Sequence, residues 1–413
     1  MTTDTPEPQE EKTPEPVAEA TAAGAEEEKR ERSKRLRLLL LLLFLLALCC
    51  IAGYFMARYL ITPKPLPEML PPVVSENLNY PPTYKSAITG VDGPMGVAVS
   101  PDGERVYVAE GKGKRFIKVF DRNGKFITSF SPPGTTELNR TPIYIAVEPV
   151  TGRVFVVDTY NNSIDIFDAE GKFIDSLIGR DMTLSKFVAG KLTGGIPDQT
   201  RMFFDGSANA VHYQVPNQAE QTVTGPGSAD WAPLGVRFDR EGNLLVTDVT
   251  SGKHRVRIIP AASLAGPLSE FAPQIAEFGT QGKENGQFLF PNSAVRDGLG
   301  NFYVSDGNNG RISKWTPSLQ YANFFGMGAV SSGLNLPRGA WLDGRNRLHV
   351  ADAVGQLIRV YDVSGEEPAF LYTFGEFGIT EGLFNYPNDI CIDETGRLYI
   401  ADRENNRISV WSY

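Results

Sequence analysis

The sequence predicts an all-β fold, a six-bladed β-propeller, preceded by a disordered tail and a single transmembrane helix. A segment that runs from a proline to an acidic residue recurs six times, and an uncharged apolar run precedes these repeats. The composition, with 41 Gly, 29 Pro and 10% aromatic residues, is that of a turn-rich globular protein. The 413-residue chain is long enough for one such domain with appendages.

The first 35 residues are expected to form a disordered tail. Residues 1–35 are rich in Glu, Pro, Ala and Thr, and they contain almost no large apolar side chains. Such a segment cannot bury enough surface to offset the entropy that is lost on ordering. A basic cluster ends the tail and precedes the apolar run; its members are Lys29, Arg30, Arg32, Lys34, Arg35 and Arg37.

Residues 36–57 are predicted to form the transmembrane helix. Residues 38–57 carry no charge and match the thickness of a bilayer core, so we expect this run to contact lipid. Because the basic cluster lies before the run, the N-terminus is expected in the cytoplasm and the rest of the chain outside the cell membrane. A cleaved signal peptide fits less well, since the preceding region is long and acidic. A lipoprotein signal is disfavoured because Leu48 precedes Cys49.

Residues 58–82 are predicted to be a stalk. They contain repeated prolines, which favour an extended and stiff backbone. The stalk would hold the following domain away from the membrane.

Residues 83–413 contain the repeat. Each unit begins with Pro, continues through an apolar strand, turns, and ends a second strand at an acidic residue, and two further strands follow it. Four antiparallel strands make one propeller blade. The six units are Pro94–Glu110, Pro142–Asp158, Pro233–Asp248, Pro291–Asp306, Pro337–Asp352 and Pro387–Asp402.

Ring closure follows from a missing strand. The last unit stops at Tyr413, one strand short, while residues 84–89 are strand-like and precede the first unit. Since an unpaired edge is a liability, residues 84–89 are predicted to be the outer strand of the sixth blade.

One interval between units is longer than the others. Pro142 and Pro233 are 91 residues apart, whereas the other intervals are 46 to 58 residues. We favour an insertion over about 178–231 rather than a degenerate seventh blade, because no Pro-to-Asp frame occurs there. The insertion contains a weak strand pair, Arg201–Phe204 and Ala210–Val215.

Two repeats resemble the NHL-repeat family most clearly. They are Tyr399-Ile-Ala-Asp-Arg-Glu-Asn-Asn-Arg-Ile408 and Tyr303-Val-Ser-Asp-Gly-Asn-Asn-Gly-Arg-Ile312. The resemblance covers about residues 84–413 and implies the propeller fold, without specifying an activity.

Residues that follow each repeat proline are expected at the mouth of the central channel, where loops of such folds carry function. Asn292, Arg338 and Asn388 would make one half of this rim polar, and Arg338 could pair with a carboxylate. Alternatively, the two asparagines only bind loop backbone. The other half would be apolar, formed by Met95, Ile143 and Leu234. The acids that end each second strand are expected to cap the loops that follow them.

Histidines test the enzyme interpretation. The loop around His254 is similar to the one that carries a zinc-binding histidine in peptidylglycine amidating lyase, a propeller of this family. The other motif histidine of that enzyme would follow a repeat proline, where this chain has Asn or Arg, so no three-histidine zinc site is predicted. We expect His254 to be a solvated loop residue and keep it as a candidate ligand-binding residue at the mouth. His349 lies within a second strand and is expected to point away from the mouth.

The favoured function is therefore binding of a protein, peptide or glycan at the cell envelope. No metal or other cofactor is predicted, and the alternative is a metal-dependent lyase or hydrolase with its site in the channel. Nucleic-acid binding is excluded, since the net charge is −9 and the pI about 5.1.

Overall fold

The structure, a computed structural model, describes residues 32, 34–54, 80–225, 230–328 and 333–413. The chain divides into two compact units, Met1–Val74 and Ser75–Tyr413, and each is described by itself. Most of the predicted tail and stalk lies outside the described residues.

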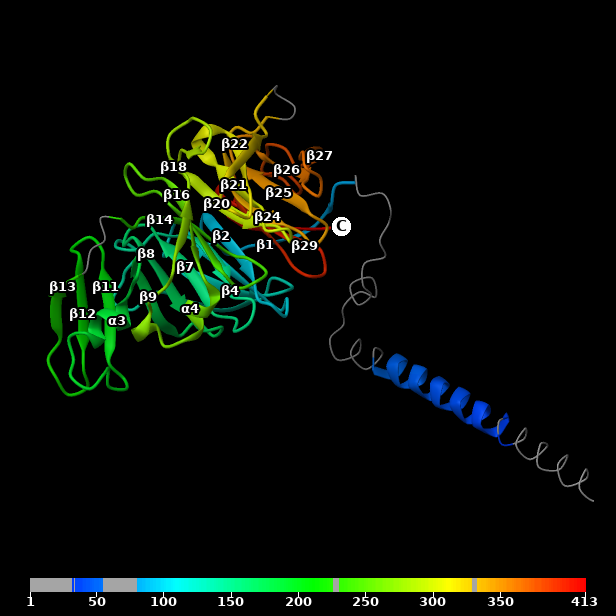
Figure 1. The fold of residues 1–413 in the computed structure, drawn as a ribbon, viewed down its shortest axis with the longest axis horizontal. Coiled ribbons are helices and arrows are strands. Elements are labelled where there is room, and N and C mark those ends of the chain that lie inside the picture. Colours follow the sequence, from blue (N-terminus) through cyan, green and yellow to red (C-terminus); the bar gives the residue numbers. More distant parts are fainter. Residues whose placement is uncertain (1–31, 33, 55–79, 226–229, 329–332) are drawn as a thin grey trace, which may run out of the picture. The chain divides into compact units, whose positions relative to one another are not determined.

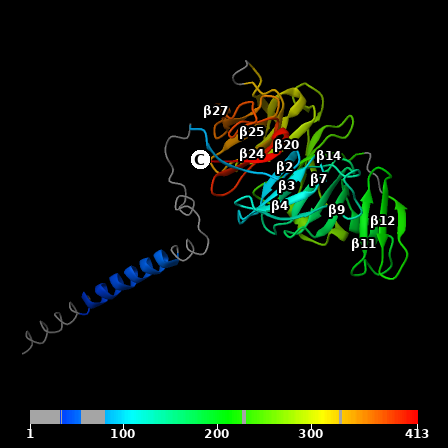
Figure 2. The ribbon, with the colours of Figure 1, turned by 180° about the vertical axis from the view of Figure 1, so that it is seen from behind.

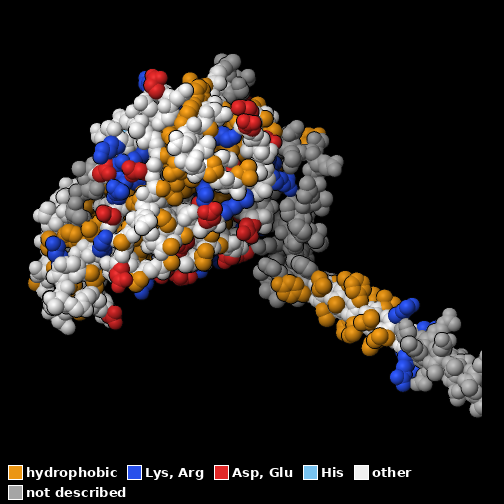
Figure 3. All heavy atoms as spheres, viewed as in Figure 1, with side chains coloured by type: hydrophobic (Ala, Val, Ile, Leu, Met, Phe, Trp, Pro, Cys, Tyr) orange, Lys and Arg blue, Asp and Glu red, His pale blue; other side chains and the backbone are white. Residues whose placement is uncertain are grey.

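The first unit contains a 21-residue helix, Lys34–Tyr54. Its apolar side chains are exposed, and basic residues lie at one end of the helix (Figure 3). Among the described residues it is the one helix whose length and composition suit a membrane span, and a signal sequence has the same features. The predicted span, 36–57, overlaps this helix, although residues 55–57 lie outside the described part.

The second unit is built from antiparallel sheets arranged around a centre (Figure 1). Six of the described sheets have four strands in the meander order of a propeller blade, one of them extended by a short fifth strand. We number them from one to six along the chain. Sheet one has β2 (Pro94–Val99), β3 (Arg105–Glu110), β4 (Ile117–Asp121) and β5 (Phe126–Phe130); sheet two has β6 (Pro142–Val147), β7 (Val154–Asp158), β8 (Ser163–Phe167), β9 (Phe173–Gly179) and β10 (Met182–Thr183); sheet three has β14 (Pro233–Phe238), β15 (Leu244–Asp248), β16 (Arg255–Ile259) and β17 (Ala276–Phe278).

The other three sheets complete the ring. Sheet four has β20 (Pro291–Arg296), β21 (Phe302–Asp306), β22 (Arg311–Trp315) and β23 (Tyr321–Phe325); sheet five has β24 (Pro337–Leu342), β25 (Arg347–Asp352), β26 (Leu357–Asp362) and β27 (Ala369–Phe374); sheet six has β28 (Pro387–Ile392), β29 (Arg397–Asp402), β30 (Arg407–Ser412) and β1 (Thr83–Ile88). Every first strand begins at a repeat proline, and every second strand ends at the predicted acid. The first strands contact one another in cyclic order, so the predicted all-β propeller is confirmed.

Residues from the two ends of the ring share sheet six. β1 pairs antiparallel with β30, and Ile88 lies opposite Ile408. In Figure 2 the blue start of the second unit runs beside its red C-terminal part. The predicted pairing of the segment around residues 84–89 is therefore confirmed. Because β1 covers the outer edge of β30, that edge is not left unpaired.

Between sheets two and three, the chain leaves the ring. Here lie α3 (Leu184–Ala189) and a three-stranded sheet of β11 (Arg201–Asp205), β12 (Ala210–Gln214) and β13 (Gln221–Thr224), which stands at one side of the ring (Figure 1). The expected strand pair is present as β11 and β12, whereas α3 and β13 were not predicted. These elements have an apolar core of their own, in which Leu184, Val188, Phe204 and Val211 are buried.

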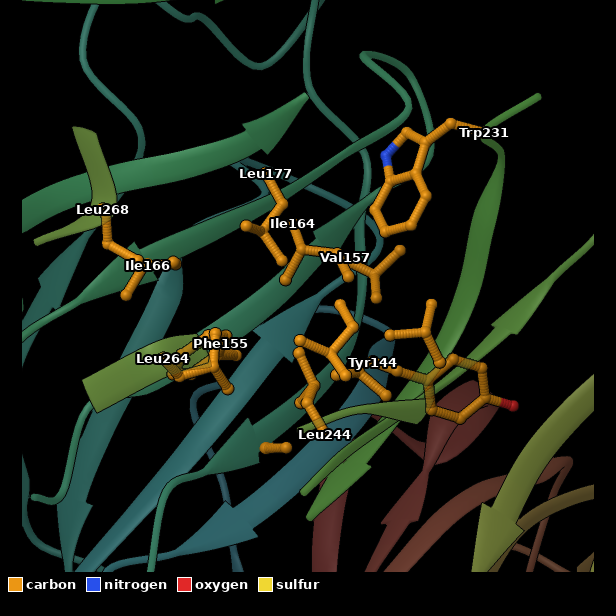
Figure 4. Packing of buried hydrophobic residues seen from close by; sticks show 14 of the residues in the cluster. Tyr144, Phe155, Val157, Ile164, Ile166, Leu177, Trp231, Leu244, Leu264 and Leu268 are labelled. Carbon is orange, nitrogen blue, oxygen red and sulfur yellow. The ribbon is translucent and has the colours of Figure 1, made fainter. Parts of the chain in front are cut away.

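The main core lies between neighbouring sheets. The inner strands are buried almost throughout because each blade is covered on both faces, and this explains their nearly continuous apolar runs. Sheets two and three share one such cluster, which includes Tyr144, Phe155 and Trp231 (Figure 4). The connection from β16 to β17 covers this cluster with two short helices, α4 (Ala261–Ala265) and the 3₁₀ helix Leu268–Glu270.

Smaller elements complete the loops. Two 3₁₀ turns follow the acids of sheets four and six, and two short strands pair in parallel before sheet four. Their bounds are Gly307–Asn309, Arg403–Asn405, β18 (Thr280–Gln281) and β19 (Gln287–Phe288).

Candidate functional site

Each first strand starts with an irregularity. The pairing register shifts just after the repeat proline in all six described first strands, for example between Pro291 and Ser293 and between Pro337 and Ala340. A bulge of this kind re-aims the side chain of the residue that it contains. The shift therefore takes the residue after each proline out of the regular ladder.

Arg338 joins residues from three sheets. Its Nη1 donates to Asn292 Oδ1 (2.8 Å) and its Nη2 to the hydroxyl of Tyr386 (3.2 Å). The structure therefore brings together two of the predicted site residues, Asn292 and Arg338. Among the residues that the structure describes, Arg338 forms no salt bridge, so its partly buried charge is solvated by neutral groups alone.

Asn292 is also tied to the backbone. It is fully buried, and its Nδ2 donates to the carbonyl oxygens of Phe290 (2.9 Å) and Pro337 (3.4 Å). Gly235 lets Asn292 approach, because a Cβ at position 235 would lie 1.9 Å from Asn292 O. Asn292 therefore binds loop backbone, as the alternative interpretation of this residue expects, and it also orients Arg338.

Polar atoms without partners lie near this arginine. Within the described part of the chain, Arg338 Nε, Asn388 Oδ1 and the hydroxyl of Tyr144 are buried and make no hydrogen bond of good geometry. Tyr144 lies within electrostatic reach of Arg338, and Figure 4 shows its hydroxyl directed away from the apolar cluster. Burial raises the pKa of Tyr144, so the hydroxyl keeps its proton and can donate. The guanidinium of Arg338 therefore lies among neutral hydroxyl and amide groups.

Asn388 lies on the neighbouring first strand, β28. It is 1% exposed, and its Nδ2 donates to Met95 O (2.5 Å), which links sheets six and one. One end of its amide therefore binds backbone, while Oδ1 has no partner among the described residues.

His254 is not solvated, contrary to expectation. Its side chain is 2% exposed, and Nδ1 accepts the backbone N–H of Phe290 (3.2 Å). Burial lowers the pKa of His254, which favours the neutral ring. When Nδ1 of a neutral ring accepts, Nε2 carries the proton, so this histidine offers no free lone pair to a metal. It was misjudged because Phe290, 36 residues away in sequence, covers it.

His349 lies inside the fold, away from the mouth, as expected. It is fully buried, and its Nε2 lies 2.6 Å from the hydroxyl of Tyr413. Burial lowers the pKa of His349 to about 4, so the ring is neutral at physiological pH.

A buried ion pair lies among the first strands, and sequence analysis did not identify it. Arg237 on β14 binds Asp389 on β28, and its guanidinium also donates to Ile145 O (3.2 Å) on β6. Asp389 accepts the backbone N–H of Val97 (3.1 Å) on β2. This pair ties together the first strands of sheets one, two, three and six. No local sequence pattern indicates this ion pair, because Arg237 and Asp389 are 152 residues apart.

The acids that end the second strands are structural. Asp158, Asp248 and Asp352 accept backbone N–H groups of the following loop, as predicted, whereas Glu110, Asp306 and Asp402 accept backbone N–H groups of the loop before the repeat proline. Asp306 Oδ1 accepts the N–H of Leu289 (2.7 Å) and Asp402 Oδ1 that of Asn385 (2.7 Å), both in loops before repeat prolines. Asp158 binds both loops, through Thr141 N and Tyr160 N. Asp248 accepts from Thr250 N, in the following loop, as predicted.

Metal binding requires several converging ligands. Within the described ranges, no three His, Cys, Asp or Glu side chains are grouped so that they could hold an ion. Asn292, Arg338 and Asn388 include no carboxylate, and the two asparagines are buried. This arrangement suits recognition of an anionic group better than cation binding.

Comparison with known proteins supports the fold family. The NHL repeat family matches residues 384–411, which include the first three strands of sheet six. NHL repeat-containing protein 2 from Gallus gallus is 37% identical over 101 residues, covering 21% of this chain and 14% of the relative. Peptidyl-glycine alpha-amidating monooxygenase from Mus musculus is 25% identical over 251 residues, covering 48% of this chain and 25% of the relative. The chain thus spans a quarter or less of the length of these relatives.

Among solved structures, a streptogramin B lyase superposes with a TM-score of 0.49 and 12% identity, covering 79% of this chain and 96% of that chain. Hydrazine synthase from Kuenenia stuttgartiensis gives a TM-score of 0.49 and 14% identity, covering 80% and 98%. Scores at this level support no inference about function. The matched repeat, the relatives with NHL repeats and the propeller topology support the NHL-repeat propeller family that the sequence predicts.

Proposed function

We propose that this chain is a membrane-anchored binding module whose channel mouth receives an anionic group of a protein, peptide or glycan outside the cytoplasm. The observation that supports it is the partly buried guanidinium of Arg338, which has no anionic partner among the described residues. A carboxylate would supply that partner through paired hydrogen bonds. The partly buried side chains of Met95 and Leu234 would contact the less polar part of the ligand, whereas Ile143 is buried in the apolar cluster of sheets two and three.

Neighbouring groups support a bound carboxylate. The hydroxyls of Tyr386 and Tyr144 are donors, and Asn292 holds the guanidinium in place. A preorganised site of this kind lowers the cost of ordering side chains on binding. Binding to a partner is also the general use of loops that a rigid scaffold presents.

Two peptides that differ only at the C-terminus test whether the channel mouth binds a carboxylate. Gly-Gly-Phe with a free carboxylate and its C-terminal amide would be titrated calorimetrically into the full chain in lipid nanodiscs. We expect the acid to bind about 10-fold or more tightly than the amide, since a hydrogen bond to a charged group contributes about 1.5–3 kcal/mol. Arg338→Gln should abolish this difference, whereas Arg345→Gln, in the β24–β25 turn of the same sheet, should preserve it. Equal binding of acid and amide to the unmodified chain would refute the proposal.

The orientation needs its own experiment. The basic residues before helix Lys34–Tyr54 favour a cytoplasmic N-terminus, with the propeller outside. An exposed cysteine at Glu366→Cys should react with a membrane-impermeant maleimide on intact cells. The unmodified chain should not react, because Cys391 is buried and Cys49 and Cys50 lie within the proposed membrane span. Labelling only after permeabilisation would place the propeller on the other side.

The alternative is a divalent-metal-dependent lyase or hydrolase in the channel. Similarity to the amidating monooxygenase over 251 residues favours it, and the occupied Nδ1 of His254 counts against it. Metal analysis of the purified full chain distinguishes the two. About one zinc or calcium ion per chain would support the enzyme, and the binding module predicts less than a stoichiometric amount.

A further inference from the structure

A cleft lies between the ring and the inserted sheet. It is bounded by Lys172 and Ile174 at the outer strand of sheet two and by Arg201, Phe203 and His212 of β11 and β12. Its volume of about 430 Å³ is within the range of sites for small ligands. None of the six residues that directly follow the repeat prolines lines this cleft, so it is separate from the channel mouth.

The cleft is preformed by contacts that hold the insertion. Gly134 has a positive φ of +71°, and a Cβ there would lie 2.5 Å from the Phe203 ring, so the loop before sheet two rests on this ring. Asn161 Oδ1 accepts the N–H of Gly206 (2.9 Å) in the β11–β12 turn. Phe204 and Val211 are buried on the opposite face of the inserted sheet. Both walls are therefore anchored without a ligand.

Two cations face the cleft without an anionic partner. Lys172 and Arg201 are exposed, and neither forms a salt bridge with any residue that the structure describes. Arg201 donates only to the neutral amide of Gln214. Both line the cleft together with Ile174 and Phe203.

The apolar wall is aromatic. Phe203 and His212 stack in parallel, with ring centroids 4.4 Å apart and an interplanar angle of 1°. His212 Nδ1 lies 3.3 Å from Glu220 Oε1 and 3.1 Å from Thr222 Oγ1, which fixes the ring. Ile174 extends this surface. A flat apolar group would be in contact with ring edges and aliphatic side chains while its charge remained at the cations.

We propose that this cleft binds a small amphipathic carboxylate, a planar apolar body that carries one anionic group. Lys172 and Arg201 bind the carboxylate, and Phe203 and Ile174 contact the body. The cations select against neutral analogues, and Glu220, which also lines the cleft, repels a second anionic group. This site is independent of the proposed function of the channel mouth.

The experiment uses para-trifluoromethylbenzoate and the neutral para-trifluoromethylbenzyl alcohol, followed by fluorine NMR with the full chain in lipid nanodiscs. We expect the benzoate to bind about 10-fold or more tightly than the alcohol. The double variant Lys172→Gln/Arg201→Gln should lose this preference. The matched control Lys191→Gln removes an exposed lysine of the same insertion that does not line the cleft, and it should retain the preference.

Phe203→Leu provides a second measurement, since it keeps an apolar contact with Gly134 but removes the aromatic stack. It should weaken both probes by a similar factor without changing their ratio. Absence of benzoate binding to the unmodified chain, or an unchanged preference in the double variant, would overturn the proposal. Because neither cation is part of the channel mouth, the double variant should bind Gly-Gly-Phe as the unmodified chain does, and loss of both ligands together would also overturn the assignment to the cleft.

Discussion

Sheets two and six are built on the same repeat, yet they carry opposite charge arrangements at equivalent positions. In sheet six, Arg407 lies opposite Asp402 and binds it (Nε to Oδ2, 2.8 Å), and Ser409 follows two residues later. Ser163 replaces the arginine in sheet two, and a second acid, Asp165, replaces the serine. Sheet six thus contains a neutralised pair.

Sheet two holds two buried carboxylates instead. Asp158 and Asp165 form no ion pair with any described residue, and Asp165 Oδ1 is held by the hydroxyls of Ser163 (3.2 Å) and Ser176 (2.6 Å). A cavity of about 10 Å³ beside Asp165 has room for one water molecule. The repeat therefore retains the hydrogen bonds that cap its backbone while its charged side chains differ between sheets. The difference occurs in sheet two, where the insertion contacts the ring.

The largest effect is expected from breaking the pair in sheet six. Arg407→Gln leaves Asp402 buried without its cation and removes the bonds of the guanidinium to the carbonyls of Thr380 and Leu383, so it should destabilise the fold by about 3–5 kcal/mol. The equivalent change in sheet two, Ser163→Ala, removes one hydroxyl and should cost about 1 kcal/mol. Thermal unfolding followed by circular dichroism measures both. Similar melting temperatures of the two variants would mean that breaking the ion pair in sheet six destabilises the fold no more than removing the hydroxyl in sheet two.

A pH-dependent effect of intermediate size is expected in sheet two. Burial, followed by the charge of Asp158, raises the pKa of Asp165 to about 7. In the unfolded chain this carboxyl loses its proton near pH 4, so stability falls as pH rises from about 4 to about 7, by at most about 1.4 kcal/mol per pH unit. Asp165→Asn should therefore raise the melting temperature at about pH 8 and have less effect at about pH 5.

Asp402→Asn is the matched control for that substitution. It removes the counter-charge of Arg407 and should destabilise the fold at both pH values. If Asp165→Asn lowered the melting temperature at about pH 8, the carboxylate of Asp165 would be stabilising and the comparison would fail.

The smallest effect concerns the asparagines three residues after Asp158 and Asp402. Asn161 and Asn405 both donate to their acid at 2.8 Å, but only Asn161 also accepts a bond from the insertion, at Gly206. Each change to Ala should cost about 1 kcal/mol or slightly more. Only Asn161→Ala should speed amide hydrogen exchange in residues 201–214. Equal exchange in both variants would show that this bond does not hold the insertion.

Much of the fold could be predicted because short segments of the sequence determine where its strands begin and end. The prolines and acids bound the strands at every repeat, and the missing last strand predicted the pairing of β1 with β30. The helix α3 was missed, although Thr183, which caps it, and the apolar Leu184 and Val188 four residues apart are signals for it. The strand β13 is short and polar, and it lacks the alternation that predicts strands.

The site was less predictable than the fold because it depends on distant partners. The sequence indicated that Asn292 and Arg338 lie at the start of first strands, but the hydroxyl of Tyr386 and the unpartnered groups of Tyr144 and Asn388 depend on how sheets meet. The same reason explains the burial of His254 under Phe290 and the pairing of Arg237 with Asp389. None of these contacts leaves a pattern within one repeat.

The strand that closes the ring also sets an order of events during synthesis. β1 leaves the ribosome before every other strand of the propeller, yet its partner β30 is made last. Sheets one to five can form while the chain grows, but β1 must wait through the translation of more than 300 residues for its partner. A nascent chain that stalls before residue 407 would therefore expose an open strand edge, the kind of surface that chaperones recognise and that aggregates when left uncovered.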